Sequence, residues 1–106
     1  MADQFDYVIV GAGSAGCLLA NRLTACGKYS VCLLEAGPPD WNPMIHIPAG
    51  FMKTIVNPSV NWLYQSEPCP GTNGRTIPMP RGKVVGGSSS INGLIFSRGQ
   101  KMDFDV

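Results

Sequence analysis

Short apolar runs flank one amphipathic stretch in the first third of the chain. Residues 5–10 become apolar toward their end and stop at Gly11, which predicts a β-strand. Residues 14–26 predict a helix that is capped at Gly27. Four residues share one face of this helix, at spacings of 4, 4 and 3: Ala15, Leu19, Leu23 and Cys26. Residues 31–34 predict a second strand, and because both strands are apolar runs we expect a right-handed βαβ unit with helices on both faces of its sheet.

Proline dominates the pattern that follows the second strand. Five prolines exclude a long helix between residues 37 and 58, namely Pro38, Pro39, Pro43, Pro48 and Pro58. Residues 49–56 remain compatible with a short helix. The chain holds 13 glycines and 9 prolines, or 21% of its 106 residues, against about 12% in average proteins. We therefore expect many turns.

Two further elements are expected in the second half of the chain. Residues 61–67 and 75–79 predict a hairpin around the turn at residues 70–74. Residues 88–96 predict a helix that begins on a serine N-cap and has one apolar face, formed by Ile91, Leu94 and Ile95. The predicted fold class is α/β: one βαβ unit with a glycine- and proline-rich extension and an incomplete sheet.

Length and charge limit the kind of protein this is. A chain of 106 residues allows one small domain with a modest core. Charged residues make up 14% of it, below the roughly 25% of an average domain, so we expect a piece of something larger. The net charge of +1 argues against nucleic acid as the main partner, although residues 68–102 hold five basic side chains and no acidic one.

The chain has no obvious targeting or metal-binding signal. No run approaches the roughly 18 apolar residues of a membrane span, and residues 1–4 do not resemble the start of a secretory signal. The four cysteines form no C-x-x-C pair and one histidine cannot complete a zinc site, so we expect no metal. Cys17, Cys26 and Cys32 fall in helix and strand patterns, as structural thiols do. A reducing, cytoplasmic location is expected, with peripheral membrane association left open.

The glycine pattern of residues 11–16 is the strongest chemical signal. Gly11, Gly13 and Gly16 form G-x-G-x-x-G directly after a strand, and Glu35 ends the next strand 19 residues later. In a dinucleotide site these glycines allow a tight turn, the approach of the pyrophosphate and close packing of the helix, while the acid binds ribose hydroxyls. The charge of Glu35 disfavours NADP. The pattern does not separate FAD from NAD, and a plain glycine turn beside a surface glutamate is the alternative.

A second glycine-rich stretch covers residues 81–93. It combines Gly86 and Gly87 with three serines and a predicted helix start, which together offer backbone donors to a long anionic cofactor. A flexible linker is the alternative, but strongly apolar residues follow at once, and a linker does not need them.

These stretches resemble the glucose–methanol–choline (GMC) flavin oxidoreductases, specifically their choline dehydrogenase-like branch. Three segments carry the resemblance: VGAGSAGCLLANR at residues 10–22, LLEAGPP at 33–39 and PRGKVVGGSSSINGLIFSRG at 80–99. IHIPAG at 45–50 and NWLY at 61–64 add to it. The resemblance implies that residues 1–106 are the N-terminal portion of a Rossmann-like FAD-binding domain, without the C-terminal substrate and catalytic region.

The resemblance also implies a cofactor role for particular residues. They are Gly11, Gly13, Ser14, Ala15 and Gly16 at the FAD pyrophosphate, Glu35 and Ala36 at the adenosine ribose, and Val84, Gly87, Ser88, Asn92, Gly93, Leu94 and Ile95 along the pyrophosphate and flavin end. Some members attach the flavin through a histidine just before the matching asparagine. Ile91 stands there, so non-covalent FAD is expected. The family's catalytic histidine belongs to the C-terminal region, so no catalytic residue is expected here.

The remaining aromatic and imidazole side chains have structural interpretations. His46 stands between two isoleucines with no acidic partner nearby in sequence, so we expect a structural role rather than a general base. Trp41, Trp62 and Tyr64 are expected to be packing residues rather than a flavin stack.

The expected function is the FAD-binding portion of an oxidoreductase acting on CH–OH donors. The resemblance implies that a base takes the proton of a small alcohol while hydride passes to the flavin; the electron acceptor is not assigned. The alternatives are an NAD-linked dehydrogenase, a non-oxidative lyase of the same family, and a truncated nucleotide-binding protein without catalysis. Because two parallel strands make an incomplete sheet, we expect residues 1–106 alone to be poorly folded and inactive.

Overall fold

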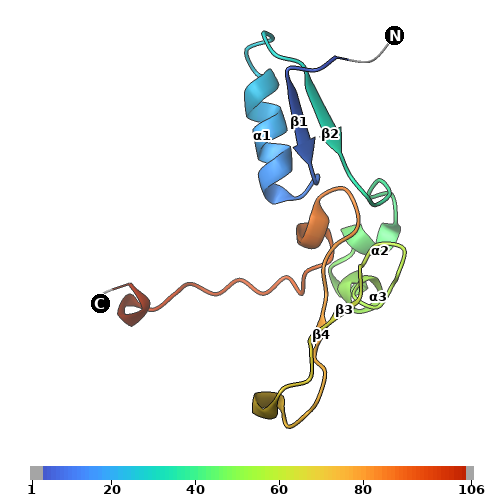
Figure 1. Ribbon diagram of the computed structural model, residues 1–106, viewed down its shortest axis with the longest axis vertical. Coiled ribbons are helices and arrows are strands. Elements are labelled where there is room, and N and C mark those ends of the chain that lie inside the picture. The colour runs from blue at the N-terminus through green and yellow to red at the C-terminus, as the bar shows by residue number, and fades with distance from the viewer. Residues whose placement is uncertain (1–3, 105–106) are drawn as a thin grey trace.

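A computed structural model describes residues 4–104 of the chain (Figure 1). Its first part is the predicted βαβ unit, with β1 at Tyr7–Val10, α1 at Ser14–Thr24 and β2 at Val31–Leu34. The two strands are parallel, with Tyr7 opposite Val31 and Val10 opposite Leu34. The helix ends at Thr24 with Ala25 as its C-cap, two residues before the expected end. Gly27 then turns the chain, with a φ of +65° and an N–H that donates to the carbonyl of Thr24. The expectation about a secretory signal falls mainly on residues 1–3, which lie outside the described part.

The two-stranded sheet is covered on one face. Helix α1 packs against both strands, and the two strands form the whole of their sheet within residues 4–104. Val8 is 60% exposed and Val10 84% exposed. The expectation of helices on both faces is therefore wrong for the described chain, while the expected incomplete sheet is confirmed.

The proline-rich segment folds into three short turns of helix. Helix α2 spans Pro43–His46, a 3₁₀ turn spans Pro48–Gly50 and helix α3 spans Phe51–Thr54. The side chain of Asn42 caps α2 by accepting a hydrogen bond of 3.0 Å from the backbone N–H of Met44. The predicted short helix at residues 49–56 thus exists as the 3₁₀ turn and α3 in succession.

The predicted hairpin is present and short. Strands β3 at Tyr64–Gln65 and β4 at Pro78–Met79 pair antiparallel, and a further bridge joins Asn61 to Gly82. A 3₁₀ turn at Pro70–Thr72 closes the tip, which points away from the βαβ unit (Figure 1).

The predicted helix at residues 88–96 is wrong. Only a 3₁₀ turn at Gly87–Ser90 forms, and Leu94 has a left-handed φ of +58°. The side chains of this segment bond to its own backbone: Ser90 donates to the carbonyl of Val85, and Asn92 accepts from the N–H of Leu94 at 2.7 Å. These bonds compete with helix formation. Beyond Ile91 the chain extends to one side of the molecule (Figure 1). A last 3₁₀ turn forms there at Lys101–Asp103.

Ile91, Leu94 and Ile95 consequently do not share a face. Ile91 is 3% exposed, while Leu94 is 60% and Ile95 90% exposed. Ile91 instead joins a small core with Val60 and Val84, against which Ile45 packs. This core lies where the α2–α3 segment, the base of the hairpin and the second glycine-rich loop meet, so it fixes that loop in place.

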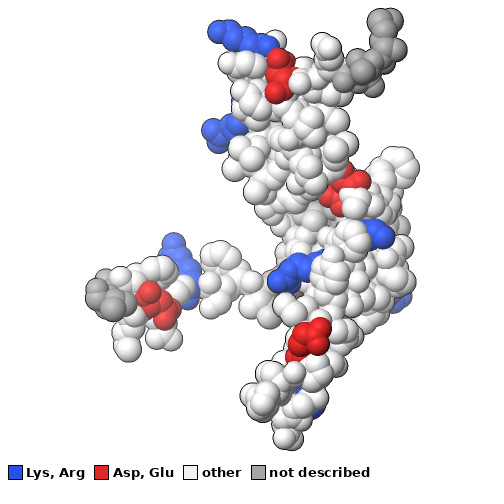
Figure 2. All heavy atoms as spheres, viewed as in Figure 1, with Lys and Arg blue, Asp and Glu red and all other residues white. Residues whose placement is uncertain are grey.

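Two observations concern charge and membranes. Figure 2 shows lysine and arginine side chains in several separate places on the drawn face, without one continuous basic patch there. Across residues 4–104, no helix combines the length and the apolar character needed to cross a membrane.

Candidate dinucleotide-binding site

The glycine turn after β1 has the geometry that its sequence predicts. Gly11 has a φ of +96°, which favours glycine, and its N–H donates to the carbonyl of Leu34 at 2.7 Å. A Cβ on Gly16 would collide with the carbonyl of Gly11, so only a glycine lets α1 pack this closely on the turn. Gly13 is the N-cap of α1 and faces open space.

The N-terminus of α1 suits an anion. No side chain caps it, and its first turn holds no acidic residue. The first N–H groups of a helix have no partner within the helix, and they carry the positive end of its dipole. An uncapped helix start behind a glycine that leaves open space therefore fits a pyrophosphate group.

Glu35 connects the end of β2 to the glycine turn. One carboxylate oxygen accepts a hydrogen bond of 2.8 Å from the N–H of Ala12, and the other accepts one of 3.0 Å from the N–H of Gly37. Sequence reasoning assigned Glu35 to ribose hydroxyls and missed this second role. Each carboxylate oxygen has two lone pairs, so both roles are compatible.

The second glycine-rich loop lies directly on the first. The N–H of Gly86 donates to the carbonyl of Ala12 at 2.7 Å, and the hydroxyls of Ser14 and Ser89 are 2.5 Å apart. Gly87 has a φ of +60°, and a Cβ on it would be 3.0 Å from the Cα of Gly13. Two loops separated by about 75 residues thus form one backbone-lined site.

A cleft of about 580 Å³ lies at this junction. Six of the predicted cofactor residues line it: Gly11, Gly13, Glu35, Ala36, Gly87 and Ser88. Four further lining residues were not predicted: Val10, Leu34, Trp62 and Gly82. Val10 and Leu34 could have been found from their place at the ends of the two parallel strands, where such ligands bind. Gly82 belongs to the glycine-rich stretch at residues 81–93 without having been singled out, and Trp62 had been assigned to packing.

The other predicted cofactor residues lie outside this lining. Ser14, Ala15 and Gly16 are in the first turn of α1, and Val84 is fully buried in the core. Asn92 and Leu94 line a small neighbouring hollow of about 30 Å³ beside α2 and α3. Gly93 lies near Phe51, and Ile95 is exposed. A role for these residues toward a cofactor stays a prediction.

Trp62 is held in place by two neighbours. Its ring stacks on Tyr64 with centroids 5.8 Å apart, and the Nζ of Lys83 is 4.8 Å from its centroid. Trp62 and Tyr64 thus stack on each other, but both side chains are partly exposed and Trp62 lines the cleft, so a packing role rather than a flavin contact stays a prediction. Trp41 is 83% exposed, so the packing expectation is wrong for this residue within the described chain.

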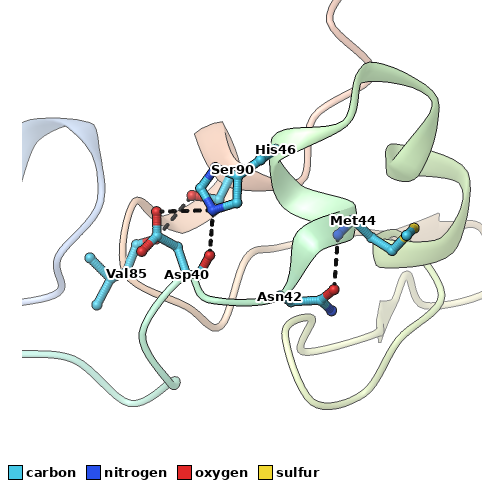
Figure 3. A network of polar contacts seen from close by, with 6 residues as sticks. All are labelled: Asp40, Asn42, Met44, His46, Val85 and Ser90. Atoms are coloured by element: carbon cyan, nitrogen blue, oxygen red, sulfur yellow. Dashed lines mark hydrogen bonds and ion pairs between the residues drawn. The ribbon is translucent and has the colours of Figure 1, made fainter.

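His46 lies in a polar network (Figure 3) and does not line the cleft. Its Nε2 is 2.6 Å from the carbonyl oxygen of Asp40 and 3.8 Å from the carboxylate of the same residue. The histidine therefore has an acidic neighbour that the sequence interpretation overlooked. Its hydrogen bond to the loop before α2 agrees with the structural role expected for it.

The cysteines lie outside the cleft lining. All four are unbridged, and Cys17 donates from its Sγ to the carbonyl of Ala12 at 3.2 Å. Cys69 lies at the hairpin tip. There a hydrogen bond with the Thr72 side chain and, to a smaller extent, one with the Thr72 backbone lower the pKa of the Cys69 thiol. In the described part of the chain, no three His, Cys, Asp or Glu side chains gather in a way that would hold a metal ion.

A strand, a glycine turn, a helix start and an acid at the end of the next parallel strand define a dinucleotide-binding α/β protein. Comparison with known families narrows this class: residues 5–106 match the GMC oxidoreductase family, and the chain belongs to it. The resemblance stated from the sequence and the Rossmann-like fold class are thereby confirmed.

Curated relatives and solved structures agree with this assignment. The chain is 52% identical over 103 residues to an alcohol dehydrogenase [acceptor] of Pseudomonas putida and 51% identical over 102 residues to an oxygen-dependent choline dehydrogenase of Rhizobium etli. These alignments cover 97% and 96% of the chain but 19% of each relative. The chain thus spans about a fifth of the length of the curated relatives it matches.

Among solved structures, a pyridoxine 4-oxidase from Mesorbium loti has a TM-score of 0.85 at 40% identity, covering 96% of this chain and 20% of that one. A formate oxidase of Aspergillus oryzae, described for modification of its FAD, has a TM-score of 0.73 at 37% identity, covering 83% and 16%. Family membership and these neighbours support the expectation of FAD as the cofactor.

Proposed function

We propose that this chain is the FAD-binding portion of an oxidoreductase that acts on the CH–OH group of a small alcohol. One observation carries the proposal: the glycine turn after β1 and the loop at residues 82–88 line the same cleft as Glu35. A single fingerprint would serve any dinucleotide, whereas a second backbone loop set against the first suits a cofactor that extends along both. The names of the relatives, an alcohol dehydrogenase and a choline dehydrogenase, support the substrate class.

The residues of the cleft have distinct tasks in this proposal. The first turn of α1 and the backbone at Gly11 and Gly13 bind the pyrophosphate. Glu35 accepts hydrogen bonds from the adenosine ribose while it holds the glycine turn through the N–H of Ala12. FAD, when bound, supplies the site that accepts the hydride. The proton of the alcohol is taken by a base outside residues 1–106.

Purification of the protein translated from the natural reading frame that contains these residues tests the proposal. We expect a yellow protein whose released cofactor is FAD, and alcohol-dependent bleaching of its flavin absorbance. A colourless protein that binds NAD would favour an NAD-linked dehydrogenase. Bound FAD without bleaching by any alcohol would favour a lyase or a binding protein. Reading the coding DNA beyond the codon for Val106 decides whether a histidine-bearing region follows.

The attachment of FAD is non-covalent in this proposal. Ile91 stands next to Asn92, where some members of the family have their flavin-bonding histidine, and its side chain is apolar and 3% exposed. Acid precipitation should leave the flavin in the supernatant. Flavin that remains with the pellet would contradict this part of the proposal.

We also propose a cytoplasmic location. Four unbridged cysteines support it, because disulfides form readily where the surroundings are oxidising. Cell fractionation tests it, and recovery in a secreted fraction would contradict it. The electron acceptor is to be found by comparing oxygen consumption with reduction of an artificial quinone in the same preparation.

A further inference from the structure

Asn61 is a buried amide that joins three segments. It is 2% exposed, and its Nδ2 donates to the carbonyl of Ile55 at 2.6 Å, just after α3. Its Oδ1 accepts from the N–H of Leu63 at 2.9 Å and from the N–H of Arg81 at 3.0 Å. One side chain thereby fastens the end of the α2–α3 segment to both sides of the hairpin base.

The backbone around this amide is in an unusual conformation. Leu63 has a φ of +54°, in the left-handed region that residues other than glycine rarely adopt. The hydrogen bond to Asn61 holds the N–H of this residue. Trp62 lies between the two, and its own N–H donates to the carbonyl of Arg81 at 2.9 Å. The position of the Trp62 ring therefore depends on Asn61, because this residue precedes Trp62 and its side chain holds the backbone of Leu63, which follows it.

Asn61 also fixes the position of Gly82. It pairs with Asn61 in an antiparallel bridge and follows Arg81, whose N–H bonds to the amide oxygen. Trp62 and Gly82 both line the cleft that contains Glu35 and Ala36. Asn61 itself does not line it.

We propose that Asn61 is a positioning residue of the cofactor cleft: its amide sets Trp62 and Gly82 at the wall that faces FAD. The inference rests on the proposed function. An amide is suited to this task because it provides a donor for Ile55 and an acceptor for two N–H groups, while an apolar side chain would leave these three part-buried groups without their partner.

Flavin affinity measured beside thermal stability separates positioning from mere support. In the full protein, Asn61→Ala should raise the Kd for FAD about ten-fold, because three part-buried backbone groups beside the cleft wall lose their partner. Thr54→Val is the matched control: Thr54 is 1% exposed and donates to the carbonyl of Phe51 within α3, away from the cleft. It should lower the Tm and leave the Kd unchanged. An unchanged Kd in Asn61→Ala with a lowered Tm would overturn the proposal.

Two further variants test the role atom by atom. Asn61→Asp keeps an oxygen for the N–H groups of Leu63 and Arg81, but it sets a second, charged oxygen against the carbonyl of Ile55. Its Tm should therefore fall, while its Kd should stay closer to that of the wild type than that of Asn61→Ala. Adding Leu63→Gly to Asn61→Ala should recover part of the affinity, because glycine adopts a positive φ without strain. The proposal is overturned if the aspartate variant binds as weakly as the alanine variant and glycine restores nothing.

Amide hydrogen exchange in the cofactor-free protein gives a measurement that does not depend on FAD. The N–H groups of Leu63 and Arg81 should exchange faster in Asn61→Ala, while the N–H of Gly11, bonded to Leu34, should not. A wild-type protein that fails to bind FAD would contradict the proposed function, and the exchange pattern would still decide whether Asn61 orders the cleft wall. Unchanged exchange at both amides would overturn the inference.

Discussion

Gly13 and Gly16 are three residues apart and serve different purposes. A Cβ on Gly16 would collide with the carbonyl of Gly11 and press on the Cγ2 of Ile9, so Gly16→Ala must push α1 away from β1. We expect a loss of about 1–3 kcal/mol of stability, typical of overpacking, together with loss of FAD binding. Thermal unfolding and flavin titration of the same preparation measure both.

Gly13→Ala is the matched comparison. Within residues 4–104, no atom beyond the adjoining residues lies within 4 Å of a Cβ at this position, and the φ of −79° is accessible to alanine. The Tm should fall less than in Gly16→Ala, because the added methyl group meets no backbone and only the poorer N-cap of alanine lowers the stability. The added methyl group would occupy the space over the helix start, so FAD affinity should still fall. Equal stability losses in the two variants would contradict the different roles assigned to these glycines.

Asp6 gives the βαβ unit a dependence on pH. Its carboxylate accepts hydrogen bonds from the backbone N–H and the hydroxyl of Ser30, each at 2.7 Å. These bonds hold the pKa of Asp6 below its ordinary value of 3.8, and the bond from the Ser30 backbone has the larger effect. A carboxyl whose pKa is lowered on folding stabilises the fold above its unfolded pKa, and this contribution disappears as the pH falls through the folded value.

Asp6→Asn should therefore unfold at a lower temperature than the wild type near neutral pH. The difference in Tm should shrink below about pH 4 and vanish at still lower pH. Melting curves of both proteins across this range test the sign. A difference that stays constant with pH would show that the hydrogen bonds, and not the charge, provide the stabilisation.

At the scale of elements, Glu35 is the connection that fixes the glycine turn to β2. In Glu35→Gln an NH₂ group must face the N–H of either Ala12 or Gly37, which loses one charge-assisted bond and sets two donors against each other. We expect a loss of about 1–3 kcal/mol of stability and weaker FAD binding. The control is Glu67→Gln, which changes an exposed acid beyond the hairpin strand. Comparable effects of the two substitutions would contradict this role.

The elements that were predicted correctly are those that depend on the pattern of residues close together in sequence. The apolar runs of β1 and β2, the helical spacing of α1 and the positive φ of Gly11 and Gly27 depend on neighbours in sequence. The helix expected at residues 88–96 failed because Ser90 and Asn92 bond to nearby backbone instead, and propensity does not count such bonds. Trp62 lines the cleft because Asn61 bonds to Arg81, a residue 20 positions further along the chain. A contact over this separation leaves no local sequence pattern, so the place of Trp62 was not predicted.

At the scale of the whole molecule, the chain exposes more surface than a compact protein of its size. Its accessible area is 8349 Å², whereas a folded monomer of 11.3 kDa has about 5,700 Å². Its radius of gyration is 17.7 Å, against about 13 Å for a compact domain of this length. Much of the excess is apolar, with Val10, Ile95, Phe96 and Phe104 each more than three-quarters exposed. Exposed apolar surface of this extent is typical of sites that contact another surface.

Residues 1–106 produced alone should therefore lack a cooperative unfolding transition. The buried side chains of the described core are few, mainly Val60, Val84 and Ile91, and their burial offsets little of the entropy lost on ordering the chain. Calorimetry should show no sharp heat-absorption peak, and a dye that binds exposed apolar surface should fluoresce strongly. The protein from the natural reading frame, if it has the length of the relatives, should unfold cooperatively and bind little dye. A sharp transition accompanied by alcohol oxidation in the 106-residue chain would show instead that this small core suffices, and that the exposed face of β1 and β2 is tolerated without a cover.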